Sequence, residues 1–168
     1  MSTPVRPPAL AVPEHLLARL HVEEFLSAYE RCLDDDELER WPEFFTDDAV
    51  YSIRPRENWD AGLPIALMLC NGRAMMHDRV RAHREANIYA PHVYRHYHSG
   101  LRVEVTENGF VVTANYLVVQ THDDGETRIY QAGRSTDYLV DNADGLRLSE
   151  RRVVADTDRV QTLLVTPI

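Results

Sequence analysis

Three histidines and a tyrosine occupy every second position of one short stretch that could carry chemistry: His92, Tyr94, His96 and His98. Side chains alternate between the two faces of a β-strand, so these four groups would share one face. Imidazoles bind metals and transfer protons near neutral pH. An open iron site of the two-histidine, one-carboxylate type also needs a carboxylate, and none lies within this run. We therefore favour hydrogen-bonded or exposed histidines here over a metal site.

A second candidate pairs the Asp78 carboxylate with the His96 imidazole. Such a pair could activate water or abstract a proton from a small molecule. The favoured alternative is a structural pair between Asp78 and an arginine or a histidine. Asp47 and Asp48, which lie close to Tyr51 in the sequence, allow a similar catalytic interpretation, but the end of a helix accounts for them more simply.

Five arginines in the same part of the chain could bind a carboxylate substrate: Arg54, Arg56, Arg79, Arg84 and Arg95. The chain has 27 acidic residues and 18 basic ones, and all the basic ones are arginine. Because carboxylates are so abundant, we expect these arginines to form ion pairs within the chain or at an interface. Cys32 and Cys70 form no metal-binding or redox motif, which predicts two reduced, partly buried thiols.

The composition is that of an acidic protein with enough apolar residues for a sizeable core. A formal net charge of −9 argues against a surface for nucleic acid or an anionic membrane. No apolar run approaches the ~20 residues that a membrane-spanning helix needs, and the N-terminal residues lack the apolar region of a signal peptide. We expect a cytoplasmic protein in which residues 1–12 form a flexible extension and residues 13–168 a single domain.

Helical patterns occupy the first part of the chain. A helix is expected from Pro13, with an apolar stripe that already includes Leu16, Leu17 and Leu20. The three aspartates at 34–36 interrupt this helix and would cap a second one. The apolar face of the second helix would be formed by Leu38, Trp41, Phe44 and Phe45. Residues 46–48 would end it.

The middle of the chain mixes short elements. Residues 49–54 are expected to form a strand, residues 56–64 a polar loop, and residues 65–70 a buried strand that ends at Asn71-Gly72. An amphipathic helix would follow from about residue 75. It would end before Pro91, because a proline disfavours helical geometry at the preceding residue.

The last part of the sequence predicts long antiparallel strands. Asx-Gly pairs at Asn108, Asp124 and Asp144 are hairpin signals, and they separate apolar runs at 110–119, 129–140 and 146–156. Long strands bend, and Gly100 and Gly133 are expected to form bulges or bends. Helices followed by a long curved sheet predict the α+β class. A curved sheet wrapped around helices would form a cone with a pocket.

Several short motifs occur in a fixed order along the chain: WPEFF at 41–45 with Tyr51, RPREN at 54–58 with GLP at 62–64, MHDRV at 76–80, YRH at 94–96 and RLSER at 147–151. Together they resemble the small (β) subunits of Rieske-type aromatic-ring-hydroxylating oxygenases. Residues 84–89 are most similar to terephthalate dioxygenase small subunits, whereas residues 54–64 and 166–168 are more similar to those of salicylate 5-hydroxylase. The resemblance runs from about Val22 to Ile168.

The resemblance implies the cone-like fold shared by nuclear-transport-factor-like and scytalone-dehydratase-like proteins. It also implies a large (α) subunit, commonly in an α3β3 hexamer, that carries a Rieske [2Fe–2S] cluster and a mononuclear Fe(II). A reductase that depends on NAD(P)H would supply the electrons. A Rieske cluster needs two cysteines and two histidines in paired motifs, and neither Cys32 nor Cys70 has a histidine at suitable spacing. We therefore expect no catalytic, cofactor-binding or metal-binding residue in this chain.

These observations predict a non-catalytic structural subunit of an oxygenase that acts on an aromatic carboxylate. Terephthalate is the first choice of substrate, and salicylate or another benzoate is the second. An alternative from another class is a stand-alone isomerase or dehydratase that uses the cone cavity with Asp78 or His96. A third alternative is a ligand-binding module without chemistry.

Overall fold

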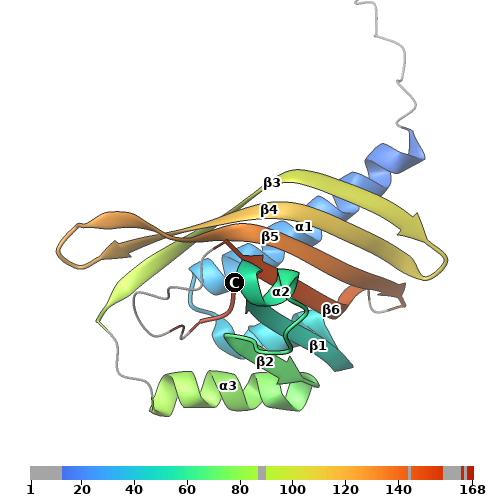
Figure 1. Cartoon of the computed structure of the whole chain (residues 1–168). Coiled ribbons are helices and arrows are strands. Elements are labelled where there is room, and N and C mark those ends of the chain that lie inside the picture. The colour runs from blue at the N-terminus through green and yellow to red at the C-terminus, as the bar shows by residue number, and fades with distance from the viewer. Residues whose placement is uncertain (1–12, 87–89, 144, 157–163, 165) are drawn as a thin grey trace, which may run out of the picture.

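The computed structural model describes residues 13–86, 90–143, 145–156, 164 and 166–168. These residues form a six-stranded sheet in the order β2-β1-β6-β5-β4-β3 (Figure 1). The strands are β1 (Phe45–Pro55), β2 (Met68–Asn71), β3 (His92–Thr106), β4 (Gly109–His122), β5 (Thr127–Asn142) and β6 (Gly145–Ala155). Strands β1 and β6 run parallel, and the other neighbouring pairs are antiparallel. The predicted α+β class is confirmed.

Helices lie on both faces of the curved sheet (Figure 1). The helices are α1 (Glu14–Asp34), the 3-10 helix η1 (Leu38–Phe44), α2 (Arg56–Asp60) and α3 (Arg73–Glu85). Helix α1 crosses one face of the long strands and packs against β3, whereas α2 lies on the opposite face, over β1 and β6. Helix α3 packs against β1, β2 and η1. The sheet thus curves around α1 and η1, which gives the predicted cone.

Helix α1 buries a single apolar stripe against the sheet. Its buried residues are Val22, Leu26, Tyr29, Cys32 and Leu33, and each lies three or four positions from another member, as one face of a helix requires. The predicted stripe was too long, because Leu16, Leu17 and Leu20 are 42%, 52% and 56% exposed. The first turns of α1 extend beyond the edge of the sheet (Figure 1), and among the described residues only Ala18 of this part packs against the core.

The segment between α1 and β1 differs from the prediction in two ways. The aspartates at 34–36 do not cap the second helix, because Glu37 is its N-cap residue and no side chain caps it. Asp36 instead takes a positive φ of 57° and turns the chain. Residues 46–48 do not end a helix either. They belong to β1, whose pairing with β6 begins at Phe45 and is irregular between Phe45 and Val50.

Residues 56–71 contain more helix and less strand than predicted. The expected polar loop begins with the short helix α2, which starts directly after Pro55. The expected strand at 65–70 begins only at Met68, and Ile65 is 62% exposed rather than buried. The predicted end at Asn71-Gly72 is confirmed, since α3 begins at the next residue.

Helix α3 ends at Glu85, several residues before Pro91. The predicted extension at 1–12, residues 87–89 and Asp144 of the third hairpin signal lie outside the described residues. None of the described helices has the length and apolarity to cross a membrane.

The long hairpins agree with the prediction, but only one of the two glycines forms the expected bulge. Gly100 has a φ of 65° and lies where the pairing of β3 with β4 shifts register. Gly133 pairs in regular register with β4 and β6. A Cβ at this position would lie 2.1 Å from the main-chain oxygen of Val154. Gly133 thus forms no bulge, and the absence of a side chain there allows a close approach of backbones.

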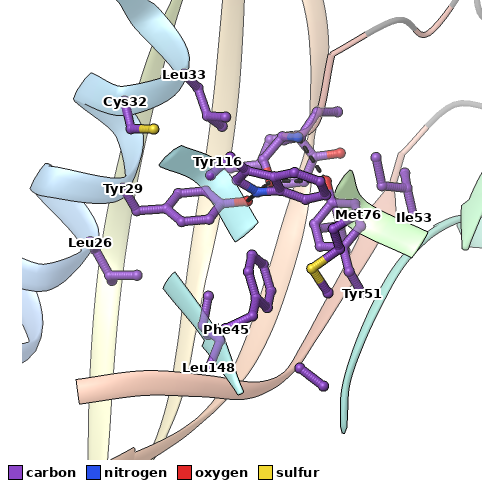
Figure 2. Close-up of a cluster of buried hydrophobic side chains, with 14 of the residues drawn as sticks. Leu26, Tyr29, Cys32, Leu33, Phe45, Tyr51, Ile53, Met76, Tyr116 and Leu148 are labelled. Atoms are coloured by element: carbon purple, nitrogen blue, oxygen red, sulfur yellow. Dashed lines mark hydrogen bonds between the residues drawn. The ribbon is translucent and has the colours of Figure 1, made fainter. Parts of the chain in front are cut away.

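Aromatic side chains fill the centre of the cone, where a pocket was expected (Figure 2). The Trp41 ring makes edge contacts with Phe45 and Tyr51, with centroid distances of 5.4 and 5.2 Å. Its indole N–H donates a hydrogen bond of 3.0 Å to the hydroxyl of Tyr29 from α1. Ile168 belongs to the same buried cluster. The core therefore joins α1, η1, β1 and the last residue of the sequence.

Candidate functional site

The histidines of β3 face α1, as their alternation predicted, but they do not gather into one site. The His96 Nδ1 atom lies 2.7 Å from a carboxylate oxygen of Asp34, and the His98 Nδ1 atom lies 2.8 Å from one of Glu30. The His92 Nδ1 atom lies 2.7 Å from the main-chain oxygen of Ala90. Among the described residues, no group of three His, Cys, Asp or Glu side chains is arranged to hold a metal ion.

Asp34 is the centre of the contact between α1 and β3. Its carboxylate also accepts a hydrogen bond of 3.1 Å from the main-chain N–H of His96, and Arg95 lies 3.7 Å away. The side chains of Asp34 and His96 are 12% and 6% exposed. A nearly buried carboxylate with three partners fixes the end of α1 to the start of β3.

The candidate pairing of Asp78 with His96 does not occur. Asp78 lies on α3, its side chain is 70% exposed, and its nearest cation is Arg81 at 3.3 Å. The favoured alternative of a structural pair is confirmed for both residues, although the partner of His96 is Asp34. Asp47 and Asp48 are likewise in structural contacts, the first with Arg73 and the second with Thr46.

Sequence reasoning missed Glu30 and Asp34, yet their spacing contains a signal. Four residues of α-helix rise about 6 Å, and two residues of β-strand rise about 6.6 Å. Acids at i and i+4 of a helix therefore match histidines at j and j+2 of an antiparallel strand. Glu30 with Asp34 and His96 with His98 fulfil this match. The two elements can therefore be held together at two points without distortion.

All five arginines contact other groups of the chain, and three of them, Arg56, Arg84 and Arg95, form the expected ion pairs. Arg84 donates hydrogen bonds to the carboxylates of Asp36 and Glu39, both at 2.7 Å. The hydrogen bonds from Arg84 lower the pKa of Glu39 to about 2. Arg56 forms an ion pair with Asp156, and Arg95 forms one with Asp34. Arg79 donates a hydrogen bond to the main-chain oxygen of Leu164, and Arg54 lies over the Trp59 ring.

Both cysteines are free and buried, which agrees with the prediction of reduced thiols. The Cys32 thiol donates a hydrogen bond of 3.1 Å to the main-chain oxygen of Glu37. Burial raises the pKa of Cys32 to about 11 and also raises the pKa of Cys70. Neither thiol is therefore a reactive nucleophile at neutral pH.

A hollow of about 540 Å³ opens on the sheet face opposite α1. It is lined by Gly100, Arg102, Thr113, Ala114, Asn115, Arg134, Ser135 and Thr136. Within the described ranges neither Arg102 nor Arg134 forms an ion pair. Two unpaired cations side by side in a protein of net charge −9 make this hollow a candidate contact for an acidic partner.

The chain is similar along most of its length to known dioxygenase subunits. It is 52% identical over 137 residues to the anthranilate 1,2-dioxygenase small subunit of Burkholderia cepacia. The match covers 81% of this chain and 85% of that subunit. It is 32% identical over 157 residues to the terephthalate 1,2-dioxygenase, terminal oxygenase component subunit beta 2, of Comamonas sp. The match covers 91% of this chain and 100% of that protein. The solved structure of the β subunit of a proposed aromatic-ring-hydroxylating dioxygenase from Novosphingobium aromaticivorans is also similar, with 42% sequence identity and a TM-score of 0.84. The match covers 93% of this chain and 100% of that one.

The family model of SnoaL-like domains matches residues 14–152. The fold is therefore that of a SnoaL-like domain, which confirms the predicted cone. More narrowly, the chain belongs to the small (β) subunits of aromatic-ring-hydroxylating dioxygenases. The resemblance found in the sequence motifs is confirmed.

The contrast between Asp34 and Asp78 gives a first prediction. Asp34→Asn should lower the free energy of unfolding by about 1–3 kcal/mol, because it weakens several nearly buried hydrogen bonds at once. Asp78→Asn should change it by less than about 0.5 kcal/mol, because an exposed ion pair contributes little. Urea unfolding of both variants measures the difference. Equal effects of the two substitutions would contradict the role given to Asp34.

The Glu30–His98 pair gives a second prediction, on pH dependence. The hydrogen bond from Glu30 raises the pKa of His98 above its ordinary value of 6.5. A raised histidine pKa stabilises the fold most below the unfolded-state value, and that contribution is lost as the pH rises through the folded-state value. The free energy of unfolding of the wild type should therefore exceed that of Glu30→Gln by the largest amount near pH 5.5–6.5. The difference should be smaller at pH 9.

Urea titrations of wild type and Glu30→Gln across this pH range measure the effect. Glu24→Gln is the matched control, because Glu24 is exposed on the same helix and forms no ion pair with a described residue. A stability difference between wild type and Glu30→Gln that stays constant, or grows, with rising pH would refute the assignment.

Proposed function

We propose that this chain is a non-catalytic structural subunit that holds a catalytic large subunit in its working assembly. The observation that carries the proposal is the use of the β3 imidazoles. His96 and His98 are engaged by carboxylates of α1 and are largely covered, so within the described part of the chain these imidazoles hold β3 against α1. The family relationship to dioxygenase small subunits supports the same role.

The proposed substrate of the assembled enzyme is an aromatic carboxylate. The names of two relatives specify anthranilate and terephthalate, each a benzene ring with at least one carboxylate. Terephthalate was the first choice from the sequence motifs. The relative with 52% identity is an anthranilate enzyme, so anthranilate becomes the first substrate to test, with terephthalate and salicylate next.

The proposed partner is a large subunit that carries the Rieske [2Fe–2S] cluster and the mononuclear Fe(II), in an α3β3 hexamer supplied with electrons by an NAD(P)H-dependent reductase. The burial of Cys32 and Cys70 in this chain's own core supports the proposal that the large subunit, and not this chain, carries the Rieske cluster. On the β subunit, the hollow with Arg102 and Arg134 is the surface we assign to an acidic segment of a neighbouring subunit.

Co-expression with a Rieske large subunit tests the assembly. Light scattering should show equal numbers of the two chains, and the complex should couple anthranilate oxidation to oxygen uptake. Replacing both arginines, Arg102→Glu with Arg134→Glu, should weaken assembly at least tenfold, because like charges at a contact cost several kcal/mol. The control is Arg81→Glu, which places the same charge on an exposed arginine of α3.

A wild-type chain that stays monomeric beside the large subunit would contradict the proposed role. Assembly that is unchanged by the Arg102 and Arg134 substitutions would leave that role intact but would remove the hollow from the contact surface.

A further inference from the structure

A second hollow, of about 220 Å³, adjoins the hollow that contains Arg102 and Arg134. It lies where α2 covers the sheet face opposite α1 (Figure 1). The two hollows share Arg134 and Thr136 of β5. The other lining residues of the second hollow are Arg56, Trp59 and Asp60 of α2 and Val154 of β6. The second hollow thus has a helix as one wall and the sheet as the other.

Two guanidinium groups at the second hollow have no carboxylate partner among the described residues. Val154 lies opposite Arg54 of β1 on one side and opposite Arg134 of β5 on the other. Residues directly opposite each other in neighbouring strands point to the same face, so the two arginines flank Val154. Within the described part of the chain neither of them forms an ion pair. The Nε atom of Arg54 is also buried without a hydrogen-bond partner there.

The charges around the second hollow favour a ligand with a single negative charge. Arg56 is a third cation, and it forms an ion pair with Asp156. Asp60 lines the hollow and adds one further carboxylate. Three arginines therefore stand against two aspartates, which leaves one positive charge without a counterion. One carboxylate would neutralise it, whereas a second carboxylate would be repelled by Asp60.

Trp59 gives the second hollow an aromatic wall. This residue is 40% exposed, although tryptophan has one of the largest apolar side chains. The guanidinium carbon of Arg54 lies 5.8 Å from the centroid of the Trp59 ring, a cation–π contact that orients the indole. Val154 adds an apolar floor from the sheet. A cation beside an aromatic and apolar surface matches a small ring that carries an acid.

We propose that the second hollow is a binding site for small aromatic monocarboxylates. Arg134 binds the carboxylate through paired N–H donors, and the ring of the ligand lies against Trp59 and Val154. A guanidinium has five N–H donors, so Arg134 can serve this ligand and also an acidic segment in the first hollow. The inference goes beyond the proposed role in assembly, and its test needs no large subunit.

The full chain on its own tests the site, with benzoate as the probe. The chain has two tryptophans, and Trp41 is 0% exposed, so the indole N–H signal of Trp59 in an NMR spectrum reports on the hollow. Benzoate should shift the Trp59 signal in a saturable manner and leave the Trp41 signal unchanged. Benzamide, which has a similar shape but no charge, should bind about tenfold more weakly or worse, because charge-assisted hydrogen bonds are lost. Terephthalate should also bind more weakly than benzoate.

Two substitutions of exposed arginines locate the bound carboxylate. Arg134→Gln should weaken benzoate binding by about tenfold or more, for the same reason as benzamide. The matched control is Arg102→Gln, which removes the same charge from the same sheet face but lines only the first hollow. It should leave benzoate binding within about twofold of wild type, because no charge-assisted hydrogen bond to the ligand is lost.

Three results would overturn the proposal: no saturable shift of the Trp59 signal, binding of benzamide or terephthalate as tight as that of benzoate, or equal weakening by Arg134→Gln and Arg102→Gln. The comparison of the three ligands uses the wild-type chain and so does not depend on any variant. None of these results bears on the proposed role in assembly, because the large subunit is absent from the measurement.

Discussion

The ion pair between Arg151 and Asp137 is the constraint on which the rest of the core depends. Their side chains are 7% and 1% exposed, and removing two charges from water costs several kcal/mol for each ion. Burial raises the pKa of Asp137, and the guanidinium opposes that rise. The two residues are direct cross-strand partners, so the pair fixes the register of β5 on β6. A slip of β6 by one residue would turn Arg151 to the other face of the sheet and leave the buried Asp137 without its partner.

The same guanidinium joins the sheet to the helix that it surrounds. Arg151 stacks over the ring of Tyr29, and Tyr29 receives the indole N–H of Trp41. A second connection, from Asp34 to His96, holds the end of α1 against the start of β3. Carboxylate, imidazole and phenol groups, which act as acids, bases or nucleophiles in many enzymes, form structural contacts between α1 and the sheet here. This use fits a subunit whose contribution to an enzyme is shape and contact surface.

The sequence predicted those features of the fold that depend on local patterns. Alternation along β3 placed His96 and His98 on one face, and the Asx-Gly pairs located the hairpins. The candidate pair of Asp78 with His96 does not form because α1, not α3, packs against β3. Nothing in the local sequence shows which helix faces a strand. The outward position of Leu16 and the burial of Ile168 were missed for a similar reason. Both depend on where the sheet ends and where the chain returns, which long-range packing decides.

The central claim, that this chain supports an active site without forming one, is tested most directly by His96→Gln in the assembled enzyme. Oxygen-coupled turnover of anthranilate should be measured with the large subunit and reductase present and normalised to the concentration of intact complex. We predict turnover within about twofold of wild type, together with a lower melting temperature of this chain. An acid–base role would instead reduce turnover by about 10²–10⁴-fold. A hundredfold loss with unchanged melting and assembly would contradict the account.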